Sequence, residues 1–300
     1  MYQHLLIPLD GSRLAEAVLP GALELARRCN ARLTLLHILE LGAPAKVHGV
    51  RHLREQAEAE RYLNETAARL DFPRERLAVE VHPTREGDVA RSIFQHAAEL
   101  QADLVVLSTH GRMGLREWIF GSIAQKVLRR GAAPVFMLQP TPTGAAPEFR
   151  PERAVVYLEG TAADQAVLAA AEGLAAQCGT SLHLLMCVPT RDTLAAQHAP
   201  TGTLLPTAMA AVLDLAERGA AEQLQTYVTH LQDRQIAASA QVVRGDALQK
   251  LIETARQRST DLICLTTHGE SGLAALGTEE VAPKILPKFN GAFLLIRAEE

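Results

Sequence analysis

The sequence predicts an α/β protein built from two tandem, doubly wound domains. Apolar, strand-like runs alternate with segments of helical period, and this whole order occurs twice along the chain. Asp103–Leu115 returns 158 positions later as Asp261–Leu273, with eight of 13 positions identical. Near the start the offset is 149, where Gly11 matches Gly160. The chain therefore contains two fused copies of one domain.

Each copy is expected to contain five strands joined by helices, which implies parallel sheets with right-handed crossovers and helices on both faces. The expected strands of the first copy are His4–Leu9, Arg32–Leu39, Leu77–His82, Leu104–Leu107 and Pro134–Leu138; those of the second lie near 153–158, 181–188, 236–243, 261–266 and 292–297. The predicted domains are residues 1–140 and 151–300. Residues 141–150, rich in Pro, Thr, Gly and Ala, form the predicted linker.

Composition narrows the class of protein further. The net charge is −4 with acidic and basic residues mixed along the chain, which argues against a nucleic-acid partner. No apolar run approaches the roughly 18 residues of a membrane span, and no signal peptide is expected at the N-terminus. The four cysteines show no CxxC spacing, and Cys29 and Cys178 match between the copies. These two are predicted to be core residues of a cytoplasmic protein.

Ligands of open parallel sheets bind beyond the carboxyl ends of the strands. Asp10-Gly11-Ser12 follows the first strand, and the segment 108–122 follows the fourth. In that segment, glycines allow close approach of backbone N–H groups, and a helix predicted to begin after Gly121 would present its positive end. This pattern indicates a phosphate site. A helix cap is the alternative, since Ser122-Ile-Ala-Gln125 also reads as a capping box.

Ser108-x2-Gly111-x9-Gly121-Ser122 resembles the signature of the universal stress protein family, Gly-x2-Gly-x9-Gly-(Ser/Thr). The likeness extends to Ile7-Pro-Leu-Asp10, to Leu-Leu-His-Ile38 and to the last strand of the first copy, and more loosely to the second copy. The resemblance implies five-stranded domains of strand order 3-2-1-4-5, frequent binding of ATP, and pairing of two domains through their final strands.

The resemblance also implies which residues bind the nucleotide. Asp10 and the backbone near Ile38 would hold adenine and ribose, Leu107 would pack on the nucleoside, and Ser108 with the loop glycines would line the phosphates, with Mg²⁺ accompanying them. Ser108 replaces the first glycine of the signature and is expected to weaken binding. The complete expected set is Pro8, Leu9, Asp10, Ile38, Leu107, Ser108, Gly111, Arg112, Gly121, Ser122 and Ile123.

The second copy is predicted to have lost this site. Without gaps, Gly121-Ser122 falls on Glu279-Glu280, and Asp10 maps to Glu159. Two carboxylates in a phosphate pocket would repel the ligand. A competing alignment retains Gly277-Thr278 as the phosphate pair, with seven rather than nine residues before it.

Other candidates have simpler explanations. His110 and His268 occupy equivalent places in both copies and are expected to be structural. His48 and His52 have helical spacing without a companion ligand, so no metal site is predicted. Arg112 and Arg116 could reach phosphate or remain in solvent.

No catalytic residue is assigned, and at most slow ATP hydrolysis is expected. Two alternatives stay open. The first is a nucleotide-free interaction scaffold. The second is an ATPase of the adenine-nucleotide α-hydrolase class, although Leu9-Asp-Gly-Ser-Arg13 lacks the Ser-Gly-Gly-x-Asp-Ser loop of that class. The oligomeric state, including a homodimer, is also left open.

Overall fold

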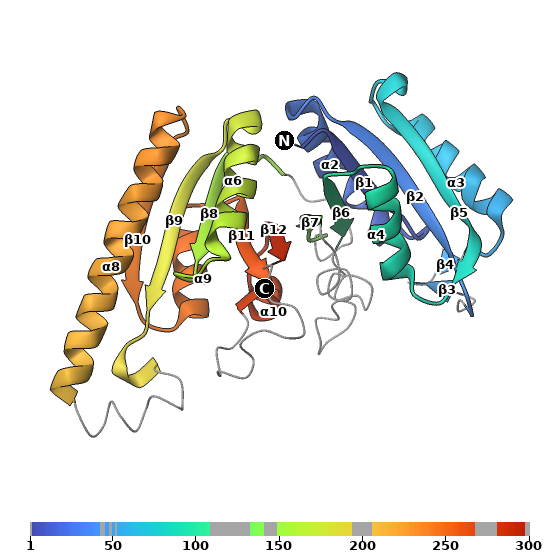
Figure 1. Cartoon of the computed structure of the whole chain (residues 1–300). Helices are drawn as coiled ribbons and strands as arrows, with labels where there is room; N and C mark the ends of the chain where they lie inside the picture. The colour runs from blue at the N-terminus through green and yellow to red at the C-terminus, as the bar shows by residue number, and fades with distance from the viewer. Residues whose placement is uncertain are drawn as a thin grey trace. The chain divides into compact units, whose positions relative to one another are not determined.

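Strands and helices alternate along the chain in the computed structural model of this protein (Figure 1). The structure describes residues 2–42, 46–47, 50–51, 53–108, 133–140, 149–193, 206–267 and 281–297. Contacts divide the chain into a first unit of residues 1–150 with 291–297, and a second unit of residues 151–290 with 298–300.

The first unit contains a parallel sheet of order β5-β2-β1-β6-β7. This is the order 3-2-1-4-5 that the family resemblance implies. A short antiparallel pair, β3 with β4, was not predicted. The elements are β1 (His4–Pro8), α1 (Arg13–Glu16), α2 (Leu19–Arg28), β2 (Arg32–Glu40), β3 (Lys46–Val47), β4 (Val50–Arg51), α3 (Gln56–Arg69), the 3-10 helix η1 (Arg74–Arg76), β5 (Leu77–Glu86), α4 (Val89–Glu99), β6 (Leu104–Ser108) and β7 (Val135–Leu138).

The last strand of the chain, β12 (Ala292–Arg297), belongs to this first unit by its contacts. It pairs antiparallel with β7, and Phe293 lies opposite Met137. The last strands of the two sequence copies therefore pair with each other, as predicted. In this way β12 covers the edge of β7 that would otherwise expose unpaired N–H and C=O groups.

The second unit has a parallel sheet of order β10-β9-β8-β11. Its long helix α8 lies along β10 and β9 (Figure 1). The α/β fold class predicted for both copies is thus confirmed. The elements are β8 (Arg153–Leu158), α6 (Asp164–Cys178), β9 (Ser181–Val188), η2 (Arg191–Thr193), α8 (Pro206–Asp233), β10 (Ala238–Arg244), α9 (Ala247–Gln257), β11 (Leu262–Thr267), α10 (Val281–Ile285) and η4 (Leu286–Lys288).

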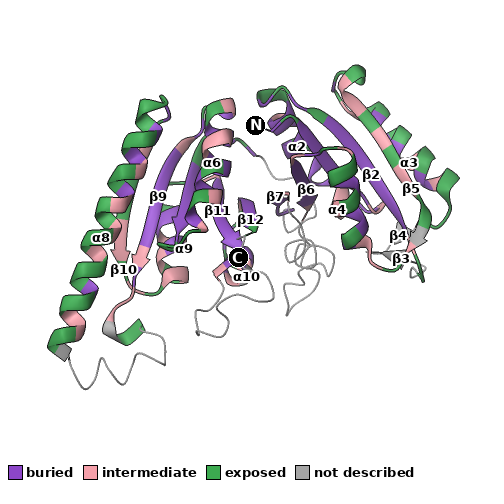
Figure 2. Cartoon of the chain, viewed as in Figure 1, coloured by how far each residue is buried: buried purple, intermediate pink, exposed green. Residues whose placement is uncertain are grey.

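The inner strands form the cores of the two units. They are nearly continuous apolar runs, because helices cover both faces of a parallel sheet. Figure 2 shows buried residues concentrated on the strands and exposed ones on the outer sides of the helices. Each fully buried Leu, Val or Phe contributes about 1.5–3 kcal/mol. Cys29 and Cys178 are buried, unbridged core residues; Cys29 is the C-cap of α2 and Cys178 is the last residue of α6.

Helix α2 comes unusually close to β7. An added Cβ at Gly21 would lie 2.3 Å from Cδ1 of the buried Leu138, so only glycine permits this approach without a shift. Among the described residues, no helix combines the length and apolar composition that a membrane crossing requires.

Two residue pairs shared by the sequence copies have structural roles. Asp88 and Asp246 are the N-caps of α4 and α9 and accept hydrogen bonds from Arg91 N and Gln249 N, at 3.3 and 2.8 Å. Asp103 accepts from His4 N at 3.1 Å, and Asp261 accepts from Arg153 N at 3.0 Å. In each copy this aspartate ties the start of the fourth strand to the start of the first.

The buried histidine of β9 makes the second unit sensitive to acid. His183 is only 4% exposed, and burial, followed by the positive charge of Arg258, lowers its pKa from 6.5 to about 4. The unfolded chain takes up this proton near pH 6.5 and the folded chain only near pH 4. Folding stability is therefore lost as pH falls through that window, by on the order of 3 kcal/mol.

We expect His183→Gln to remove this part of the acid sensitivity. Urea unfolding of the wild type and of the variant at about pH 7 and about pH 4.5 measures how much stability each loses in acid. The free energy of unfolding should fall more steeply in the wild type than in the variant, and equal losses would show that His183 does not titrate in this way.

Candidate functional site

The candidate site lies at the carboxyl edge of the first unit's sheet, where the strand order changes direction. From β1 the chain continues to β2 on one side, while β6 pairs with the other side of β1. This switch point is where doubly wound sheets bind ligands. The turn after β1 and the end of β6 are therefore the elements that matter.

The end of β1 is held firmly against β2. Leu9 N donates to Leu36 O at 2.8 Å. The ring of His37 lies with Nδ1 2.7 Å from Leu9 O, so its Nδ1–H tautomer donates to that carbonyl. Leu9 and His37 are almost fully buried. His37, which precedes the expected Ile38, is thus a supporting residue that the sequence did not single out.

The turn itself begins with Asp10. Its Oδ1 accepts a hydrogen bond from Ser12 N at 2.8 Å, and Ser12 Oγ accepts from Ala15 N at 3.1 Å. Ser12 is therefore the N-cap of α1, while Asp10 shapes the turn. Gly11 has φ +87°, a conformation that favours glycine, and a Cβ there would lie only 3.1 Å from Cδ1 of Leu53. Both the backbone conformation and the close approach of Leu53 therefore favour glycine at this position. The second carboxylate oxygen of Asp10 makes no hydrogen bond within the described residues.

The other expected residues of the described part lie at the same edge. Leu107 and Ser108 end β6, with Leu107 buried and Ser108 half-buried. Ile38 is buried near the end of β2, two residues beyond Leu36, the partner of Pro8. The fold thus brings the ends of β1, β2 and β6 together, although Asp10 and Ser108 are 98 positions apart in the sequence.

The remaining predicted residues lie outside the described part of the chain. From the binding set these are Gly111, Arg112, Gly121, Ser122 and Ile123. The other residues considered from the sequence that also lie outside the described part are His48, His52, His110, Arg116, Trp118, His268, Gly277, Thr278, Glu279 and Glu280.

Tyr62 of α3 is a neighbour of this edge that the sequence analysis missed. Burial raises the pKa of its phenol above the ordinary value, and the carboxylates of Glu16 and Asp10 raise it further. The phenol therefore stays protonated and neutral near the Asp10 carboxylate. Only the packing of α3 against β2 and β5 brings it there.

The corresponding turn of the second unit is closed by a carboxylate of its own chain. Asp164, only 1% exposed, accepts from Glu159 N at 2.9 Å and from Gly160 N at 2.8 Å. Burial raises the pKa of Asp164, while hydrogen bonds from the backbone of residues 159–161 act in the opposite direction. Asp164 takes the place of Ala15 at the offset of 149. The backbone donors that follow the first strand are therefore already occupied in this copy.

The strand order and the turn at the β1–β6 switch point define a doubly wound α/β protein, with the candidate site at the carboxyl edge of the first unit's sheet. Residues 1–139 and 152–297 each match the model of the universal stress protein family. The chain belongs to this family and contains its domain twice.

Relatives and solved structures agree with this membership. Universal stress protein YxiE of Bacillus subtilis is 26% identical over 157 residues, covering 46% of this chain and 100% of YxiE. Universal stress protein A homolog 1 of Coxiella burnetii is 29% identical over 136 residues, covering 42% of this chain and 89% of that protein. A universal stress protein from Archaeoglobus fulgidus has the same fold, with a TM-score of 0.69 and 13% identity over 100% of this chain and 98% of its own.

Proposed function

We propose that this tandem universal stress protein is a cytoplasmic regulatory module that binds ATP in its first unit. The observation that carries the proposal is the meeting of Asp10 and Ser108 at adjacent strand ends, directly before the glycine loop of the family signature. A switch-point turn followed by backbone N–H donors suits a mononucleotide.

The described residues fit the nucleoside part of such a ligand. Asp10 is half-buried and keeps one carboxylate oxygen for hydroxyl donors such as those of ribose. Pro8, Leu9 and the backbone near Ile38 would flank the base, and Leu107 offers an apolar surface beside it. Ser108 is small enough to adjoin phosphate and can donate a hydrogen bond to it.

The phosphate part of the proposal rests on the sequence of the loop. Gly111, Gly121 and Ser122 would supply backbone and hydroxyl donors, with Arg112 and Ile123 beside them. Mg²⁺ bound with ATP would neutralise part of the phosphate charge. No general base is assigned, so the proposed role is binding, with hydrolysis slow at most.

The second unit is proposed to be a non-binding copy. Asp164 occupies the donors of its first turn, and Glu159 adds a second carboxylate at the same strand end. An anionic nucleotide would meet two negative charges there. The first unit has Asp10 at the place of Glu159 but lacks the second carboxylate, because Ala15 stands at the place of Asp164.

Titration of the full chain with Mg-ATP tests the proposal. Emission of Trp118, the only tryptophan, and thermal unfolding of the first unit should both show saturable binding, and ATP at 100 times its dissociation constant should add about 2.7 kcal/mol of stability. Asp10→Ala should weaken binding at least tenfold, while Glu159→Ala, the matched change in the second unit, should not.

The outcome separates the alternatives. Absence of any saturable response to ATP would leave the nucleotide-free scaffold as the function. Multiple turnover of ATP to ADP would instead favour the ATPase. Equal weakening by the two alanine variants would contradict the placement of the site in the first unit.

A further inference from the structure

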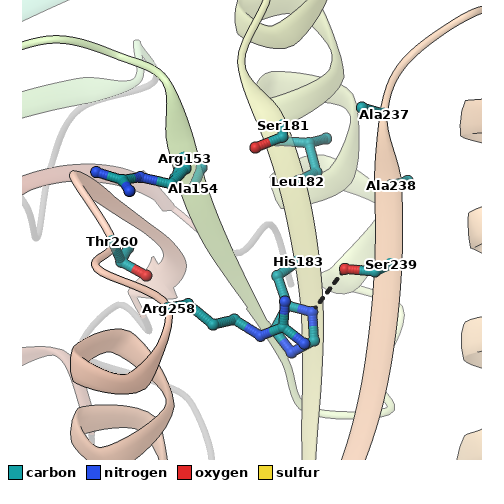
Figure 3. Close-up of a pocket in the computed structure, with 10 residues that line it drawn as sticks. All are labelled: Arg153, Ala154, Ser181, Leu182, His183, Ala237, Ala238, Ser239, Arg258 and Thr260. Carbon is teal, nitrogen blue, oxygen red and sulfur yellow. Dashed lines mark hydrogen bonds between the residues drawn. The ribbon is translucent and has the colours of Figure 1, made fainter.

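The second unit contains a pocket at the edge of its sheet opposite to Glu159. Arg153, Ser181 and Ala238, the first residues of β8, β9 and β10, all line it (Figure 3). Its volume is about 260 Å³. Since the family's signature loop follows the carboxyl end of a strand, this pocket at the amino ends is separate from the proposed nucleotide site.

His183 contributes an unsatisfied ring nitrogen to this pocket. The residue is 4% exposed, and its Nδ1 lies 2.9 Å from Ser239 Oγ. Nε2 is buried and has no hydrogen-bond partner in the described part of the chain. Burial and the charge of Arg258 lower the pKa of the ring to about 4, so the ring is neutral at pH 7. The Gln241 side chain opposes them more weakly as a nearby hydrogen-bonding group, although it does not reach Nε2 with the geometry of a hydrogen bond. When the Ser239 hydroxyl donates to Nδ1, Nε2 carries the proton and is a donor.

Thr260 contributes a second buried polar atom. Its Oγ1 also has no hydrogen-bond partner among the residues that the structure describes. A buried hydroxyl without a partner is unfavourable, because the loss of its hydration is not compensated by a hydrogen bond. His183 and Thr260 both line the pocket, so a polar ligand bound there would lie next to two polar atoms that lack a partner among the described residues.

Two arginines give the pocket its charge. Arg258, the C-cap of α9, is exposed, forms no ion pair with any described residue and extends toward His183 (Figure 3). Arg153 contacts Asp261 through Nε and Nη2, each at 3.4 Å. These contacts are longer than the 2.7–2.9 Å of a strong charged hydrogen bond, so Arg153 keeps donor capacity. With Asp261 balanced by Arg153, the charge of Arg258 makes the pocket positive.

In the first unit, protein side chains occupy the position that corresponds to this pocket. His4 stands at the position of Arg153 and Thr34 at that of His183, as the strand registers show. His4 Nε2 lies 2.8 Å from Thr34 Oγ1, and Nδ1 lies 3.0 Å from the carbonyl of Leu100, the C-cap of α4. In the first unit, His4 and Thr34 therefore hydrogen-bond to each other. In the second unit, this place holds two arginines, Arg153 and Arg258, and two polar groups without a hydrogen-bond partner among the described residues, on His183 and Thr260.

We propose that the second unit binds a small oxyanion, a phosphoryl or carboxylate group, in this pocket. Arg258 and Arg153 supply the charge, and Thr260 Oγ1 and His183 Nε2 supply neutral donors that are already desolvated. Guanidinium groups with additional donors are the usual partners of such oxyanions. A volume of about 260 Å³ suits inorganic phosphate or a small carboxylic acid and is below the range of pockets that hold a whole nucleotide.

The experiment titrates the full-length protein with inorganic phosphate and, separately, with acetate, at constant ionic strength. Ring-nitrogen NMR of the histidines reports on His183 directly. Saturable shifts of the His183 resonances are expected with at least one of the two anions. The anion with the lower dissociation constant shows whether the pocket prefers a phosphoryl or a carboxylate group. Titration without any saturable shift at His183 would overturn the proposal.

Four variants sharpen the test. Arg258→Ala should weaken anion binding at least tenfold, whereas Arg256→Ala, which removes an equal exposed charge from the same helical turn, should change it less than twofold. Thr260→Val should also weaken binding while leaving the fold intact, because it removes only the unpartnered hydroxyl. Equal losses of anion affinity in Arg258→Ala and Arg256→Ala would mean that the anion responds only to the net charge of the surface, and would refute a specific binding site. Asp10→Ala should leave this binding unchanged, which separates it from the nucleotide site.

Discussion

Gly121→Glu is expected to abolish the stabilisation of the first unit by ATP. The substitution copies the second sequence copy, in which the ungapped repeat places Glu279 at this position. A carboxylate among phosphate oxygens in a poorly solvated cleft costs several kcal/mol, on the order of the whole binding energy of a micromolar ligand. We therefore expect the added stability of about 2.7 kcal/mol at saturating ATP to fall close to zero.

Gly121→Gln is the matched control, because it has nearly the same size without the charge. If repulsion is the cause, the glutamine variant should retain part of the ATP response. If both variants lose it equally, the size of the side chain is responsible and the charge argument fails. A full ATP shift in Gly121→Glu would refute the phosphate loop. The free energy of unfolding, measured for each variant with and without Mg-ATP, distinguishes these three outcomes.

Phe293→Ala is expected to unfold the first unit more easily, although the residue belongs to the second sequence copy. Phe293 is fully buried in β12 and lies opposite Met137 of β7. Truncation of a buried Phe to Ala costs about 3–5 kcal/mol, because the transfer energy is lost and a cavity remains. Since β12 belongs to the first unit by its contacts, the destabilisation should appear there.

Hydrogen exchange followed by mass spectrometry locates the effect. Peptides that contain β6 and β7 should exchange faster in Phe293→Ala than in the wild type. Arg297→Ala, at the exposed end of the same strand, should change stability by less than about 0.5 kcal/mol. Faster exchange confined to residues 151–290 would contradict the assignment of β12 to the first unit.

Much of the fold follows from local sequence pattern. The five apolar runs of the first copy become β1, β2, β5, β6 and β7, with boundaries that differ by a few residues. Apolar runs of this kind are reliable because a strand covered on both faces must be apolar throughout. The match of Asp88 with Asp246 was visible as a repeat, but its role as a helix cap required the backbone geometry.

The candidate sites were predictable only in part. Asp10 and Ser108 were predicted because a family signature and a strand-end rule both point to them, and their role in binding stays a prediction. Tyr62, His37 and Asp164 were missed, because each reaches its site through packing between elements distant in sequence. No local pattern distinguishes such a side chain from an ordinary residue of a helix or strand.

The sequence by itself determined that the chain is a doubled α/β protein, because the periodicity of apolar residues and the repeated segments can both be read directly from the order of the residues. Only the tertiary structure decided that the last strand completes the first unit, that Asp164 closes the second turn, and that Arg258 and His183 line one pocket. These contacts join residues far apart in the chain, and their energies depend on burial and distance, which no linear pattern records.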